Sequence, residues 1–159
     1  MNNSREISEM KIDSKEEFYD TLQNIYSIEE YFEGMHYWVG RIISEPRYDD
    51  LLTRLAEDSK EHKERLDELI SKIEGFKPEE NDKDGFDFEK DLEDEKILDT
   101  VLENDHSALY HYSLLKKSVD EELLLKMMNE GDISSYHETL EFLIQEELKH
   151  IKMLRSELD

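Results

Sequence analysis

The residues whose types and spacing most clearly could bind a ligand or take part in catalysis are Glu147 and His150. They lie in the segment QEELKH, residues 145–150. They are three positions apart, so a helix would project both side chains from one face, about one turn apart. The surrounding segment, TLEFLIQEELKHIKMLRSEL, has apolar residues at helical spacing, and both polar residues fall on that apolar stripe. Two ionisable groups on an inward face need partners, because burying either one unpaired is costly.

Two kinds of partner would satisfy this pair. The first is mutual, a hydrogen-bonded Glu147 and His150 without metal, and for an isolated ExxH spacing this is the simpler explanation. The second is a divalent cation, which binds a neutral imidazole and an ionised carboxylate at the same time.

A second segment repeats the pattern and favours the cation. Residues 52–70, LTRLAEDSKEHKERLDELI, align with residues 140–158, LEFLIQEELKHIKMLRSEL, so that leucines pair with leucines and His62 pairs with His150. This alignment indicates an internal repeat of one helical hairpin. Ser59 stands at the position equivalent to Glu147. In the segment VLENDHSALYHY, residues 101–112, Asp105 is an acid in a predicted core position.

Composition predicts an all-α fold that positions these residues. The chain has 159 residues, enough for one domain with a real core, and only five Gly and two Pro. Its net charge of -23 argues against nucleic acid or an anionic membrane as partner. Because cysteine is absent, disulfides, iron-sulfur clusters and thiolate catalysis are excluded. The polar N-terminus lacks the apolar core of a signal peptide, which predicts a cytoplasmic protein.

The chain divides into four amphipathic helices and one long connection. Residues 1–13 are expected to be a flexible segment and residues 14–159 the helical bundle. The expected helices run from Ser14, a capping-box residue, to about 43, from Pro46 to about 73, from 87–94 to about 129, and from a second capping box at Ser135 onward. Residues 74–88 contain Gly75, Pro78 and Gly85 and are expected to cross over between two helical hairpins.

This layout resembles the ferritin-like superfamily and, within it, the rubrerythrin-type diiron four-helix bundles. Members carry one Glu on the first helix, ExxH on the second, one Glu on the third and ExxH on the fourth, all directed inward around two metals. The stretches that carry the resemblance are LAEDSKEHKERL, ENDHSALYHY and IQEELKHIKML, and it covers roughly residues 14–158.

The resemblance implies a set of metal ligands, of which three are identical to the family's residues. These are His62, Glu147 and His150, while Asp105 stands where the family has Glu and Ser59 replaces the Glu of the second helix. On the first helix, aligning IEEYFEGMHYW by Tyr37 selects Glu30, whereas aligning by Gly34 selects Tyr31, and Glu33 is a further alternative. We take Glu30 as the ligand.

Two functions remain open at this point. A full site would hold two ions, of iron or else manganese or zinc, and would handle iron, oxygen or peroxide with electrons from an external donor. An incomplete site would leave an inactive ferritin-like scaffold that holds one structural metal, or none, and serves as an interaction module. The resemblance is compatible with a homodimer in both cases.

Overall fold

The described part of the chain is helical and comprises residues 10–34, 45–80 and 93–158 of the computed structural model. Its helices are α2 (Lys15–Glu33), α3 (Pro46–Ser71), α4 (Asp94–Lys117), α5 (Glu121–Met127) and α6 (Ile133–Leu158), with the 3-10 turn η2 (Glu130–Asp132) before α6. No strand occurs within these ranges, where the only β-type pairing is an isolated bridge between Ile12 and Val119. The predicted all-α class is therefore confirmed.

Two of the predicted helix starts are confirmed by the local structure. The Ser14 side chain accepts a hydrogen bond from the Glu17 backbone N–H at 3.2 Å, which is the N-cap bond of the predicted capping box. Pro46 occupies the first turn of α3, where its missing N–H costs nothing. The predicted end of the first helix near residue 43 falls among residues 35–44, outside the described residues.

The structure corrects the start of the last helix. The capping box at Ser135 was wrong, because α6 already begins at Ile133, directly after the turn η2. Ser135 lies inside the helix, and its hydroxyl accepts a hydrogen bond from Lys72 Nζ at 3.2 Å. That bond links the start of α6 to the residue that follows α3.

The third predicted helix is also shorter than expected. It was predicted to continue to about residue 129, but α4 ends at Lys117 and a separate α5 follows. The break has a non-local cause. The Ile12 N–H donates to the Ser118 carbonyl at 2.7 Å, and the Asp120 N–H donates to the Ile12 carbonyl at 2.9 Å. Ile12 is itself buried, so the packed unit begins before residue 14.

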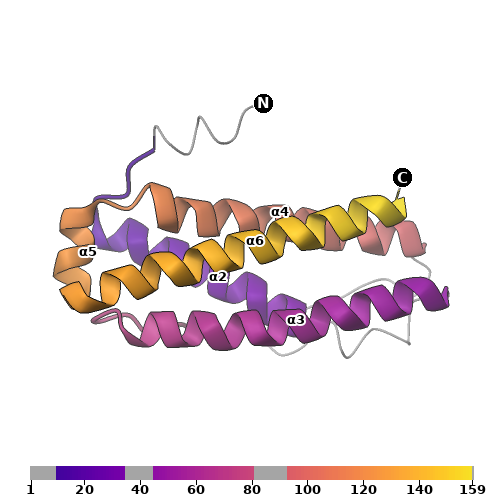
Figure 1. Ribbon diagram of the computed structural model, residues 1–159, viewed down its shortest axis with the longest axis horizontal. Coiled ribbons are helices and arrows are strands. Elements are labelled where there is room, and N and C mark those ends of the chain that lie inside the picture. The colour runs from indigo at the N-terminus through magenta and orange to yellow at the C-terminus, as the bar shows by residue number, and fades with distance from the viewer. Residues whose placement is uncertain (1–9, 35–44, 81–92, 159) are drawn as a thin grey trace.

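The four long helices lie side by side along the length of the molecule (Figure 1). Helix α2 contacts α3 and α4, and α6 contacts α4 and α3. In Figure 1, α3 and α4 run in the same direction while α2 and α6 run in the opposite one. Two consecutive parallel helices require a long connection between them. The described part of that connection, residues 74–80, is not helical, and residues 81–92 lie outside the described residues.

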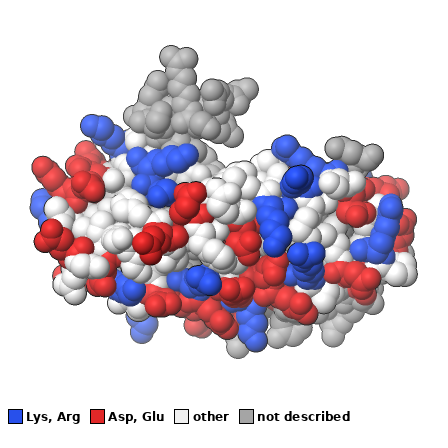
Figure 2. Space-filling model, in the orientation of Figure 1, with Lys and Arg blue, Asp and Glu red and all other residues white. Residues whose placement is uncertain are grey.

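The interior is apolar at both ends and polar in the middle. Leucines at matching positions of α3 and α6 are all buried, namely Leu52, Leu55, Leu66, Leu140, Leu143 and Leu154. Between these leucine pairs, the same faces carry His62, Glu147 and His150. The described helices include none that combines the length and apolarity needed to cross a membrane. On the face drawn in Figure 2, acidic side chains gather along the edge where α3 lies.

Candidate metal site

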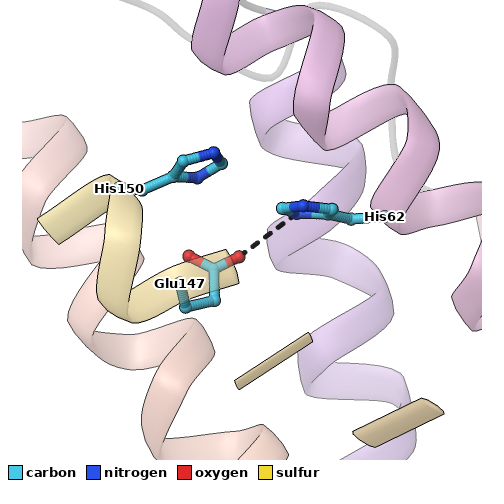
Figure 3. A group of neighbouring side chains, drawn as sticks. All are labelled: His62, Glu147 and His150. Carbon is cyan, nitrogen blue, oxygen red and sulfur yellow. Dashed lines mark ion pairs between the residues drawn. The ribbon is translucent and has the colours of Figure 1, made fainter. Parts of the chain in front are cut away.

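His62, Glu147 and His150 form one buried cluster between α3 and α6. Each side chain is at most 1 % exposed, and one ligand atom from each lies within 4.8 Å of the others. The two imidazole rings are stacked with their centroids 5.2 Å apart. His62 Nδ1 lies 3.5 Å from Glu147 Oε1, and Figure 3 shows the carboxyl group directed at the His62 ring. Two histidines and a carboxylate are a ligand set that transition metals bind.

The other two long helices each add a buried carboxyl group. Glu29 on α2 is fully buried, and Asp105 on α4 is 2 % exposed. Both interact directly with Glu147, and both also experience the charge of His62. The Tyr112 hydroxyl donates a 2.7 Å hydrogen bond to Glu29 Oε1, so this carboxyl group is fixed by a buried tyrosine. All four long helices thus contribute at least one side chain to the cluster.

Each histidine has a second carboxylate on its outer side. His150 Nε2 donates to Asp58 Oδ2 on α3 at 2.9 Å, and His62 Nε2 lies 3.5 Å from Glu146 Oε1 on α6. The contacts are reciprocal, since each histidine is met by the residue before the Ser59 or Glu147 position on the facing helix. A proton held on Nε2 leaves the Nδ1 lone pair to bind a metal, which is how a carboxylate orients a metal-binding histidine.

Several buried polar atoms of the cluster have no hydrogen-bond partner among the described residues. They are Glu29 Oε2, His62 Nδ1, Asp105 Oδ2 and Glu147 Oε2. Four lone-pair-bearing atoms facing one interior region would be expensive without a proton or a cation to share. This chemistry fits a metal ion, because a cation can accept all these lone pairs at once.

The pKa shifts of the buried groups also fit a metal site. Burial raises the pKa of Glu29 to about 7, although the charge of His62 opposes the shift. Burial, reinforced by the neighbouring carboxyl groups, also raises the pKa values of Asp105 and Glu147 well above their ordinary range. Burial lowers the pKa of His150, which favours the neutral imidazole that metals bind. Without a cation, burial therefore favours the protonated form of these carboxyl groups.

Only some of the predicted ligands lie in the buried cluster. His62, Asp105, Glu147 and His150 are buried together, as the sequence predicted. Glu30 is not in this cluster. It is half-buried and interacts with Tyr26 and Lys63 instead. Among the alternatives, Tyr31 is half-buried against the apolar core, and Glu33 accepts a salt bridge from Lys63 Nζ at 3.0 Å.

The first-helix carboxyl group that reaches the cluster is Glu29, which sequence reasoning missed. A signal was present. Phe18, Leu22, Ile25, Glu29 and Phe32 follow an alternating spacing of four and three residues. That spacing keeps one face toward neighbouring helices, so it predicts Glu29 rather than Ile28 on the inward face. All five of these side chains are buried.

The missing acid of α3 is a buried serine. Ser59 is 2 % exposed and lies one turn before His62, as Glu147 lies one turn before His150. A hydroxyl is neutral and cannot replace a bridging carboxylate. The α3 side of the cluster therefore supplies a histidine but no inward acid.

Comparison of the chain with protein-family models, with curated proteins and with solved structures finds no match.

Proposed function

We propose that this protein is a ferritin-like, rubrerythrin-like bundle that binds a redox-active transition metal and handles iron, oxygen or peroxide. The observation that carries the proposal is the buried group of His62, Glu147 and His150, which could hold a metal ion. An interior position, two nitrogen ligands and adjacent carboxyl groups are typical of metal centres built inside helical bundles.

The topology supports the ferritin-like part of the proposal. Two hairpins, α2 with α3 and α4 with α6, are joined so that α3 and α4 run in parallel. A bundle with one long crossover is the arrangement of ferritin-like folds, in which every helix directs ligands inward. Here α2, α3, α4 and α6 supply Glu29, His62, Asp105 and the Glu147–His150 pair, respectively.

The ligand chemistry favours iron, with manganese and zinc as alternatives. Imidazole binds iron and zinc, while carboxylates suit manganese and also bind iron. A redox-active ion at this position would supply the electrons for oxygen or peroxide reduction. The chain's own residues have three roles: His62, Glu147 and His150 bind the ion, Asp58 and Glu146 orient the histidines, and the flanking leucines exclude water. Further electrons would come from an external donor protein or reductant.

A second candidate function is favoured by Ser59. A dimetal centre that no longer catalyses a reaction and has become structural can lose one of its inward carboxylate ligands. The protein would then be an interaction module whose bundle is stabilised by a single ion. This candidate predicts bound metal that neither changes oxidation state nor consumes oxygen.

Metal content and ferrous oxidation test the proposal. Protein purified without chelator should contain stoichiometric iron or manganese by elemental analysis, and Glu147→Gln should remove it. Glu138→Gln, the same change at an exposed site of α6, is the matched control and should keep the metal. Addition of ferrous iron under air should consume oxygen. Bound metal without oxygen consumption supports the structural candidate, and metal below about a tenth per chain in all proteins excludes both.

A further inference from the structure

We infer that Ser59 limits the site to one metal ion, which takes both histidines, so that the centre is mononuclear. The inference rests on the proposed metal binding and goes beyond it by fixing the number of ions and the residue that determines it. Its basis is the juxtaposition of His62, Glu147 and His150 at a position where α3 offers a serine.

The separation of the histidines favours one ion. Metal–ligand bonds of about 2.0–2.2 Å place two ligand atoms of one ion at most about 4.4 Å apart. The three ligand atoms here already lie within 4.8 Å of one another, so small side-chain rotations suffice. Two ions about 3.5–4 Å apart, each bound by one histidine, would need nitrogen atoms roughly 5–8 Å apart. The two histidine ligand atoms lie within 4.8 Å of each other, which is shorter than that separation, so two ions would require the rings to move apart.

The outer carboxylates hold the rings in this relation. Asp58 on α3 engages His150 of α6, and Glu146 on α6 engages His62 of α3. Each contact crosses between the helices and occupies an Nε2 atom. Both Nδ1 atoms are thereby left available to bind a metal, and that of His62 lies 3.5 Å from Glu147 Oε1. The two histidines are positioned for a shared ion by contacts from opposite helices.

Ser59 is what keeps a second ion out. An ion on the α3 side would need a carboxylate beside His62, at the position equivalent to Glu147. Glu29 reaches the cluster from α2, but its Oε1 already accepts from Tyr112, so it offers only Oε2 and not a bridging carboxylate. Ser59 contributes no charge at this buried position. A longer acidic side chain at 59 would supply the missing ligand.

Manganese titration with electron paramagnetic resonance tests this inference. Metal-free protein titrated with Mn²⁺ should bind one ion per chain and give the six-line signal of an isolated ion. Ser59→Glu should bind two ions and show the altered spectrum of a spin-coupled pair. Ser59→Ala, which removes the hydroxyl without adding charge, is the matched control and should still bind one. Two ions in the wild type, or one in a folded Ser59→Glu protein, would overturn the inference.

Two histidine variants also test the number of bound ions, and they do so without adding a buried acid. If one ion uses both rings, His62→Gln and His150→Gln should each weaken Mn²⁺ binding by about 100-fold or more, the upper end of losses seen for outer-sphere partners. If there were two ions, each variant would keep one ion at nearly unchanged affinity, and the inference would be wrong. Circular dichroism confirms that the variants remain folded. Absence of any binding to the wild type would refute the proposed function itself, a result distinct from binding two ions.

Discussion

Helices α3 and α6 face each other with nearly the same inward pattern and differ at one chemical point. Both place buried leucines on either side of a buried histidine, and both present an outer acid to the other's histidine. They differ one turn before the histidine, where α6 has Glu147 and α3 has Ser59. Both helices therefore keep the same apolar packing, whereas only α6 has an inward carboxyl group that could bind a metal.

The largest expected effect tests whether the two halves pack equally. Leu66 on α3 and Leu154 on α6 occupy equivalent, fully buried positions. Leu66→Ala and Leu154→Ala should each lower the free energy of unfolding by about 2–5 kcal/mol, since each leaves a cavity in a dense core. Chemical denaturation of the metal-free protein measures both. A difference between the two variants of more than about 2 kcal/mol would show that the packing is not equivalent.

The next effect compares the two outer carboxylates. Asp58→Asn and Glu146→Gln should each weaken metal binding by about 10–100-fold, because each removes the acceptor that orients a histidine. Asp58→Asn should have the larger effect, since its contact with His150 is 2.9 Å against 3.5 Å for Glu146 and His62. Competition with a chelator of known affinity gives the values. Equal, negligible losses would mean that the rings are held by packing alone.

The smallest expected effect is a dependence of the metal-free protein's Tm on pH, which the buried carboxyl groups should control and Ser59 should not. Burial raises the pKa of Glu29 from 4.5 to about 7 and that of Glu147 well above its ordinary value. A raised carboxyl pKa favours the folded state while the group is protonated, so this stability is complete below about pH 4.5 and lost as pH rises through about 7. The Tm of the metal-free protein should therefore fall by on the order of 5 °C between these values.

Variants at the equivalent positions of α6 and α3 test whether Glu147 causes this pH dependence. Glu147→Gln should flatten the dependence, because a neutral amide removes one of the coupled acids, whereas Ser59→Ala should leave it unchanged. Differential scanning calorimetry across the pH range measures each Tm. Saturating metal should reduce or reverse the slope, because metal binding requires ionised carboxylates. A metal-free wild type whose Tm rises steadily from pH 5 to pH 8 would contradict the shifts.

Local sequence patterns predicted the parts of the structure that local physics controls. Helical periodicity placed His62, Asp105, Glu147 and His150 inward, and the repeat identified Ser59 as the odd position. Capping chemistry located the start of α2 at Ser14. The inward placement of Glu29 was missed because Ile28 and Glu29 are adjacent, and a register taken from apolar residues alone prefers the isoleucine.

The remaining errors have non-local causes. Helix α4 ends at Lys117 because Ile12, more than a hundred positions away, forms backbone hydrogen bonds with Ser118 and Asp120. The start of α6 at Ile133 places Ser135 where it meets Lys72. The outer contacts of Asp58 and Glu146 could not be predicted from the sequence either. Acidic residues are common along the chain, and these two gain their histidine partners only from the facing helix.

The meeting of four helices at one buried cluster has a consequence for hydrogen exchange. The cluster draws on Glu29, His62, Asp105 and the two residues of α6, so an ion bound there contacts or borders segments spread over most of the described chain. Opening α3 or α6 would require giving up the ion, and α2 and α4 pack directly against these two helices. Amide protons at the centres of α2, α3, α4 and α6 should therefore slow together on metal binding, while those of α5 change least. The bundle would exchange as a single cooperative unit when loaded and as two hairpins when empty.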